Sequence, residues 1–155
     1  MSDRISLLIK NLKTINNLEI IDNFSDIKRL SKDFYNYSPV LEKKLNSCIA
    51  DVVVRPENVQ SVKDVAKLCC ELSIPLTLRG GGTGNYGQCV PMKRGVVMQM
   101  KNFNRIEEFY PETGFVKVQS GCLMGDLNKE LGKYGRELRL IPSTWKTATI
   151  GGFIS

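Results

Sequence analysis

The sequence predicts an α+β fold organised around one strand–helix–strand (βαβ) unit, and three neighbouring stretches support this fold class. A β-branched run, Val52–Val54, is followed by Pro56, as expected for the end of a buried strand. A segment with apolar residues at helical spacing comes next, and then a second apolar run over residues 74–78. Such a unit almost always has a right-handed crossover. At 155 residues, 42% of them hydrophobic, the chain is long enough to bury a core of its own.

Helices are expected before this unit. Apolar residues recur at helical spacing near the N-terminus, where Lys10 and Lys13 interrupt them, and this pattern suits an amphipathic helix better than a signal peptide. Residues 1 to about 35 are therefore predicted to be helical, and a short turn or helix is expected near residues 41–45. Without a signal peptide, the protein is expected to be cytoplasmic.

The helix of the βαβ unit has both a start signal and an apolar face. Asn58 or Ser61 can cap its N-terminus. The apolar face comprises Val62, Val65, Ala66, Cys69 and Leu72. Cys69 is expected to pack as a small core hydrophobe, and no histidine is present to activate its thiol.

The second strand leads into a glycine-rich stretch, Arg79–Gln88, in which five glycines fall within eight positions. Glycines weaken helices and strands, so the cluster predicts a loop. Without Cβ atoms, successive N–H groups can converge and form a nest for a phosphate or pyrophosphate. A hydrogen bond to a charged group is worth about 1.5–3 kcal/mol, so several amides can hold an anion without a lysine. Ligands also favour this carboxyl end of parallel strands.

Two known nucleotide motifs and one structural alternative compete with this interpretation. Gly82–Gly87 reads as GxGxxG, and Glu107 lies 20 residues after its last glycine, near the acidic position of a Rossmann site. A Rossmann motif must open a helix, however, and Pro91 and Gly95 oppose a helix here. The P-loop pattern fails because Gln88-Cys89 stand where Lys and Ser/Thr are required. A mobile glycine loop without a ligand is the remaining alternative.

Three further strands are expected after the loop. The candidates are residues 96–100, 105–110 and 115–119, and Pro111–Gly114 make the turn between the last two. Glu107 and Glu108 are adjacent, so on a strand they should point to opposite faces and make a poor carboxylate pair.

The last part of the chain predicts a helix and a second glycine-containing site. Apolar residues from Leu123 to Tyr134 mark a helix that should stop near Gly132 or Gly135. A Ser-Thr-rich segment then leads to Thr149–Ser155, where the backbone could again meet a ligand.

Composition excludes several classes of chemistry. The absence of histidine rules out Ser-His-Asp and Cys-His catalysis within this chain and removes the commonest transition-metal ligand. The five cysteines form no CxxC pair, so we expect reduced thiols and no metal site. A net charge of +6 helps to attract an anion, but the basic residues are scattered and no nucleic-acid-binding motif occurs. No apolar run approaches the roughly 18 residues of a membrane span.

Four pieces of sequence stand in a fairly specific order and spacing over residues 35–155. They are Val52–Pro56 with Val62, Pro75–Asn85, Val116–Gly121, and Pro142-Ser143 with Ala148–Gly152. Together they resemble the flavin-binding domain of the vanillyl-alcohol oxidase and p-cresol methylhydroxylase (PCMH-type) family, in particular its glycolate oxidase/D-lactate dehydrogenase-like branch. The resemblance implies a PCMH-type FAD-binding fold, of which this chain holds the N-terminal part only.

The resemblance also implies a cofactor site. The loop from Gly80 to Asn85 would bind the FAD pyrophosphate through backbone amides, with Thr83 adding a hydroxyl contact. The second motif, residues 142–152, would line the cofactor partly near the flavin. The implied cofactor-binding residues are Arg79, Gly80, Gly81, Gly82, Thr83, Gly84, Asn85, Gln88, Pro142, Ser143, Thr144, Ala148, Thr149, Gly151 and Gly152. Some members attach FAD to a histidine at the position of Thr83 or to a cysteine near Pro142. This chain has no histidine and no cysteine after Cys122, so FAD is expected to bind non-covalently.

Family members continue beyond the glycine pair with the second half of the FAD domain and a substrate domain that supplies catalytic residues. We therefore name no catalytic residue, and expect a region outside this sequence or a partner chain to bind the small-molecule substrate. Residues 1–45 are predicted as an N-terminal helical segment and residues 46–155 as the first half of the FAD-binding domain. The chain is expected to be truncated, a gene fragment or one component of a split protein.

The expected function is part of a flavin-dependent dehydrogenase or oxidase of a hydroxy acid or alcohol. Cofactors carry such chemistry, so few reactive side chains are needed. The alternatives are a non-catalytic nucleotide-binding or assembly module, or an inactive fragment.

Overall fold

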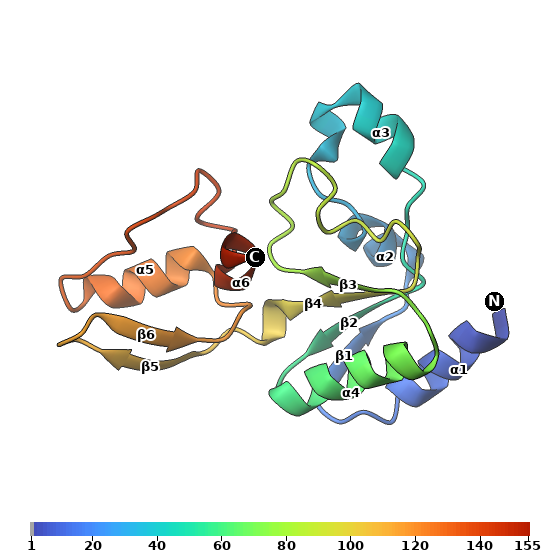
Figure 1. The fold of residues 1–155 in the computed structure, drawn as a ribbon, viewed down its shortest axis with the longest axis horizontal. Helices are drawn as coiled ribbons and strands as arrows, with labels where there is room; N and C mark the ends of the chain where they lie inside the picture. Colours follow the sequence, from blue (N-terminus) through green and yellow to red (C-terminus); the bar gives the residue numbers. More distant parts are fainter. Residues whose placement is uncertain (1) are drawn as a thin grey trace.

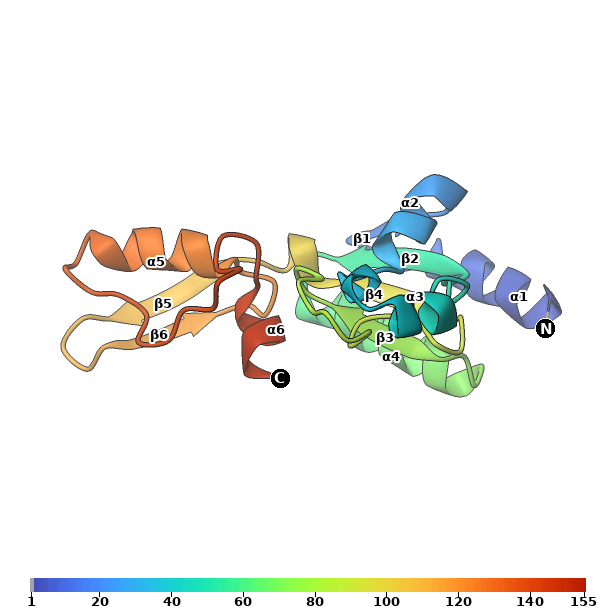
Figure 2. The same cartoon turned by 90° about the horizontal axis from the view of Figure 1, so that it is seen from above.

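The computed structural model describes residues 2–155, which form two lobes (Figures 1 and 2). The larger lobe is built on a four-stranded sheet with the strand order β1-β2-β4-β3. The smaller lobe contains the two-stranded sheet β5-β6 and the helices α5 and α6. A short 3-10 helix, η2 (Met100–Asn102), leads from one lobe into the other.

The sheet of the larger lobe is mixed. Its strands are β1 (Leu18–Ile21), β2 (Val52–Pro56), β3 (Leu76–Arg79) and β4 (Val96–Gln99). β2 and β3 both run parallel to β4, and β1 runs antiparallel to β2. The two central strands, β2 and β4, are buried on both faces, which explains their nearly continuous apolar sequence.

Helices cover both faces of this sheet. α1 (Ser2–Leu12) and α4 (Val59–Glu71) pack on the face that carries Val52 and Val54, whereas α2 (Phe24–Leu30) packs on the face that carries Val53. Neighbouring valines of β2 thus serve opposite layers, because successive strand side chains alternate between the two faces. A smaller cluster joins η1 (Tyr35–Tyr37) and α3 (Pro39–Leu45) to Val90, which follows the glycine-rich stretch.

The prediction of helix over residues 1 to about 35 was wrong at Leu18–Ile21. These residues form β1, which pairs with β2 over the whole of its length. Met1 lies outside the described residues. The division of the chain after residue 45 stays a prediction, although β1 and β2 pair across it.

The strand, helix and strand of the βαβ unit form in the predicted order as β2, α4 and β3. Asn58 caps α4 by accepting a hydrogen bond from the Ser61 N–H (2.8 Å), and the Ser61 side chain completes a capping box. The strand β4 lies between β2 and β3, so the two strands that α4 connects are not neighbours.

The smaller lobe contains the predicted hairpin and helix. β5 (Ile106–Tyr110) pairs with β6 (Phe115–Val118), and α5 (Met124–Gly132) shares an apolar cluster with both strands. The expectation that Glu107 and Glu108 point to opposite faces was wrong. A register shift between Ile106 and Glu108 breaks the alternation, and both carboxylates reach Lys117 Nζ, at 3.2 and 3.5 Å. Within residues 2–155, no helix has the length and apolar character needed to cross a membrane.

Cys69 lies in the core, as predicted, and its burial has a measurable consequence for stability. Burial raises the pKa of its thiol from the ordinary 9.0 to about 11. The unfolded chain ionises this thiol first, so the free energy of unfolding should fall as the pH rises from about 9 to about 11. Urea denaturation across this pH range, compared with Cys69→Ala, measures the effect. Equal pH slopes for the two chains would contradict it.

Candidate functional site

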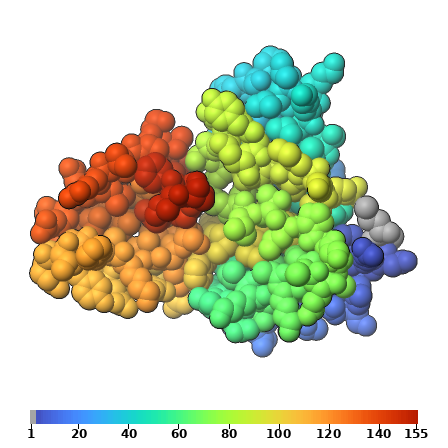
Figure 3. Space-filling model, in the orientation of Figure 1, coloured from blue at the N-terminus to red at the C-terminus, as the bar shows by residue number. Residues whose placement is uncertain are grey.

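The glycine-rich loop runs from the end of β3 to β4 and borders a cleft between the two lobes. The cleft has a volume of about 880 Å³. Figure 3 shows the surface hollowed between the loop and the C-terminal residues. No helix opens after Gly87, and the next regular element is β4. The loop therefore lacks the helix N-terminus that a Rossmann site requires, as predicted.

Most of the residues predicted to bind the cofactor line this one cleft. They are Arg79, Gly80, Gly81, Gly82, Thr83, Gly84, Gln88, Pro142, Thr144, Ala148, Thr149, Gly151 and Gly152. The other two, Asn85 and Ser143, are not among the lining residues. Stretches some 60 residues apart in the sequence thus meet at one place, although their contact with a cofactor stays a prediction.

Two glycines of the loop are required by the second motif. A Cβ atom at Gly80 would overlap Thr149 Oγ1, and one at Gly81 would overlap the carbonyl oxygen of Thr147. The two motifs therefore touch each other directly, without space for a side chain between them. Close backbone contact between the lobes is a second reason for glycine here, besides ligand approach.

Two other glycines are required by backbone conformation. Gly82 has φ 69° and Gly87 has φ 83°, in the left-handed region that side chains disfavour. Gly82 also lies against the Arg79 guanidinium, because a Cβ atom there would overlap Nη2. The loop backbone is thus folded over a buried arginine.

The backbone amides of the loop form a row of free donors. The N–H groups of the five consecutive residues from Gly81 to Asn85 donate no hydrogen bond to any residue that the structure describes. The next two amides are engaged: Tyr86 N–H donates to Gln88 Oε1 (3.0 Å), and Gly87 N–H donates to Asp33 Oδ2 (2.9 Å). Unpaired N–H groups on consecutive residues are the donors that an anion nest uses.

Three consecutive residues for which the sequence predicts no role at the site hold this loop in place. The Lys32 carbonyl accepts a hydrogen bond from Arg79 Nη1 (2.6 Å), Asp33 accepts the one from Gly87, and the Phe34 N–H donates to the Gly84 carbonyl (2.8 Å). The other Asp33 oxygen accepts from the Tyr35 N–H (2.9 Å). An isolated aspartate between a lysine and an aromatic residue carries no recognisable signal, so sequence alone could not find it.

The amides of the second motif are already used within the protein. Ile150 N–H donates to the Cys122 carbonyl (2.8 Å) and Gly151 N–H to the Ser120 carbonyl (2.8 Å), while Gly152 N–H donates to Thr149 Oγ1 (3.2 Å). Thr149 is the N-cap of the short helix α6 (Ile150–Ile154). This motif therefore contributes a packing surface to the cleft, in contrast to the free donors of the glycine loop.

The charges around the cleft suit an anion. Arg79 and Lys93 are its only charged side chains among the described lining residues, and none of these residues is acidic. Burial raises the pKa of the Cys89 thiol beside Arg79, so this thiol stays neutral near pH 7. Over residues 2–155 no cluster of cysteine, aspartate and glutamate is arranged to hold a metal ion.

A match to a known protein family covers most of the chain. Residues 50–155 match the protein family described as FAD binding domain. The chain belongs to this family. The matched residues include the glycine loop and the second motif, but not the Lys32–Phe34 segment that holds the loop.

The chain is similar in sequence to parts of longer enzymes. It is 34% identical over 118 residues to D-2-hydroxyglutarate dehydrogenase of Escherichia coli, 32% over 145 residues to D-lactate dehydrogenase of Anaerostipes hadrus, and 28% over 134 residues to glycolate oxidase subunit GlcD of Bacillus subtilis. These matches cover 74%, 88% and 86% of this chain, but only 11%, 30% and 28% of the relatives. The chain thus spans less than a third of their length.

Solved structures confirm the fold. The chain matches p-cresol methylhydroxylase with a TM-score of 0.76, over 99% of this chain and 29% of that one, at 17% identity. It matches alkyldihydroxyacetonephosphate synthase with a TM-score of 0.79, over 96% of this chain and 31% of that one, at 19% identity. At such identities the likeness concerns the fold alone, which is the predicted PCMH-type α+β fold.

Proposed function

We propose that this chain binds FAD non-covalently and forms the pyrophosphate-holding part of a flavin-dependent oxidoreductase that acts on a hydroxy acid or alcohol. The observation that carries the proposal is the row of free amides from Gly81 to Asn85, beside a cleft whose charged side chains are cationic. A pyrophosphate offers several acceptor oxygens and a negative charge, which match these donors and charges.

The substrate class is proposed from the relatives. Their names specify D-2-hydroxyglutarate, D-lactate and glycolate, which are all 2-hydroxy acids. When bound, FAD supplies the redox chemistry by accepting a hydride. The role of this chain's residues is to bind and orient the cofactor, and the substrate would be held by a region outside this sequence or by a partner chain.

Non-covalent attachment is proposed from the side chains at the cleft. The chain has no histidine. Some members of the family that the sequence resembles attach FAD to a histidine in this loop, and Thr83 occupies that position here. Cys89 is the one thiol among the described lining residues, and it is 8% exposed and in contact with Arg79.

FAD titration of the purified chain tests this proposal. We expect FAD to bind at least about tenfold more tightly than riboflavin, which lacks the pyrophosphate, because each charge-assisted hydrogen bond is worth more than 1.4 kcal/mol. Isothermal titration calorimetry measures both affinities, and heat denaturation should release all the flavin without changing the protein mass. Failure to bind FAD, or equal affinity for the two flavins, would contradict the role of the loop.

A nucleotide-binding module without turnover is the second candidate. The side chains that line the cleft, as far as the structure describes it, include neither a carboxylate nor a histidine that could move a proton. Dye reduction with D-lactate, glycolate or D-2-hydroxyglutarate and added FAD separates the two candidates. Reduction by the chain or its natural complex supports the oxidoreductase, and FAD binding with no reduction in the natural complex supports the module.

A further inference from the structure

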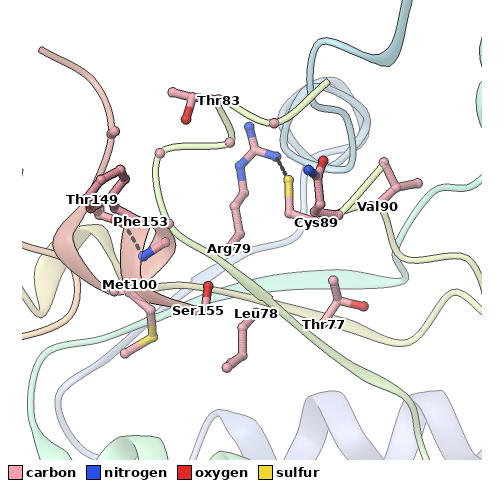
Figure 4. A pocket seen from close by; sticks show the side chains of 18 of the residues that line it. Thr77, Leu78, Arg79, Thr83, Cys89, Val90, Met100, Thr149, Phe153 and Ser155 are labelled. Carbon is pink, nitrogen blue, oxygen red and sulfur yellow. Dashed lines mark hydrogen bonds between the residues drawn. The ribbon is translucent and has the colours of Figure 1, made fainter. Parts of the chain in front are cut away.

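Arg79 is a buried arginine at the point where β3 enters the glycine loop. Its side chain is 8% exposed although it carries a full positive charge. In Figure 4 it rises from the end of the strand toward Cys89, with Thr83 on the loop beyond its guanidinium. Buried charges are normally paired, so the partners of this side chain decide what it does.

The hydrogen-bond partners of Arg79 are neutral. Nη1 donates to the Lys32 carbonyl (2.6 Å) and to Cys89 Sγ (3.1 Å). Nε is buried and has no partner within the described part of the chain. Because burial raises the pKa of the Cys89 thiol, that group is uncharged near neutral pH and does not neutralise the guanidinium.

The carboxylate of Asp33 lies near the Cys89 thiol, but its hydrogen bonds are made to other groups. Both of its oxygens accept backbone hydrogen bonds, one from Tyr35 and one from Gly87. Within the 2–155 range, no carboxylate lies within the 4.0 Å of Arg79 that would make an ion pair. Asp33 keeps its negative charge while it accepts these hydrogen bonds, so Arg79 has a carboxylate nearby but no ion pair, and its own hydrogen bonds go to neutral groups.

One of the free amides belongs to Gly82, which lies against this charge. Gly82 packs against Nη2, and its left-handed conformation turns the backbone across the guanidinium. The unpaired N–H groups run from Gly81 to Asn85 on either side of that contact. A buried charge acts more strongly over several ångströms than an exposed one, and salt screens it less.

We propose that Arg79 is a positioning residue for a diphosphate. It acts from beneath the loop and does not contact the diphosphate itself. Its guanidinium supports the conformation of Gly82 and supplies the positive potential that draws the diphosphate onto the amides from Gly81 to Asn85. This role differs from the direct cofactor contact predicted from the sequence. The inference rests on the proposed FAD site and assigns the residue that gives this site its charge.

Three variants separate charge from shape. Arg79→Met removes the buried charge, Arg79→Lys keeps it, and Lys93→Met removes an exposed charge from the lining of the same cleft. Affinities for FAD and for inorganic pyrophosphate are measured by calorimetry at about 0.05 M and about 0.5 M salt, where exposed charges are screened very differently. Melting temperatures report whether each variant folds.

We expect Arg79→Met to weaken binding of both ligands by about 10- to 100-fold at either salt concentration, and Arg79→Lys to restore it to within about fivefold. Lys93→Met should weaken binding less, and only at low salt. Unchanged pyrophosphate binding in a folded Arg79→Met chain would overturn the proposal, as would equal losses in both Arg79 variants. If Arg79→Met does not fold, Arg79→Lys decides, because a loss above about 100-fold would assign shape, not charge, to the residue. Absence of FAD binding by the unaltered chain would instead contradict the proposed function, and pyrophosphate would still test Arg79.

Discussion

Gly81→Ala should abolish measurable FAD binding, a loss of at least about 100-fold. A Cβ atom at this position would overlap the carbonyl oxygen of Thr147 and crowd Ala148, both of which are backbone neighbours that cannot rotate away. The loop would have to separate from the second motif, displacing the free amides that begin at Gly81. We also expect the free energy of unfolding to fall by about 1–3 kcal/mol, as for overpacked sites. Calorimetric FAD titration and urea denaturation measure the two effects.

Gly132→Ala is the matched control for this substitution. Gly132 is the last residue of α5, its φ is not in the left-handed region, and a Cβ atom there would meet no atom within 4 Å. Alanine in a helix is favoured over glycine by about 0.5–1 kcal/mol, so this variant should be slightly more stable and bind FAD normally. If Gly81→Ala behaved like Gly132→Ala, the direct contact between the two motifs would not exist in solution.

The elements predicted correctly are those with strong local signals. The capping residue Asn58 directly precedes α4 and its apolar stripe, and the turn Pro111–Gly114 lies within one hairpin. Such patterns reflect the covalent neighbourhood of each residue, which the sequence displays directly. The order of motifs then identified the PCMH-type fold, which the structural matches confirm.

The features that the sequence did not reveal depend on distant partners. β1 has four residues, too few to display a period, and its pairing with β2 decides that it is a strand. The sequence likewise does not show that β4 lies between β2 and β3, because this order depends on β4 being buried on both faces by distant elements. A contact between Asp33 and Gly87 joins residues 54 positions apart, and nothing in either neighbourhood specifies the other.

The glycines illustrate how one pattern can have several physical causes. The glycine cluster in the sequence predicts close approach of a ligand. The structure gives Gly80 and Gly81 a role in packing against the second motif, and gives Gly82 and Gly87 a left-handed backbone. Neither cause competes with ligand binding, because the contacts that require glycine hold the loop in the shape that leaves its amides free.

Asp33→Asn should weaken FAD binding by about 10- to 30-fold and lower the free energy of unfolding by about 1.5–3 kcal/mol, the worth of a hydrogen bond to a charged group. The two carboxylate oxygens accept from Tyr35 and Gly87, at 2.9 Å each. Asparagine has one acceptor oxygen, so its amide NH₂ would face one of these N–H groups donor to donor. Either the loop at Gly87 or the start of η1 would lose its attachment.

Asp33→Asn also removes one negative charge, and this loss by itself should favour binding of an anionic ligand. Asp22→Asn is the control for this effect. Asp22 belongs to the same N-terminal stretch, is exposed, and makes no hydrogen bond or ion pair with the described residues. It should bind FAD at least as tightly as the unaltered chain, because removing a carboxylate raises the positive potential. A weaker Asp33→Asn variant therefore cannot owe its defect to charge, and the loss must come from the loop. Equal FAD affinities in the two variants would mean that residues 32–34, which precede the region matched to the FAD binding domain, are not needed to hold the loop.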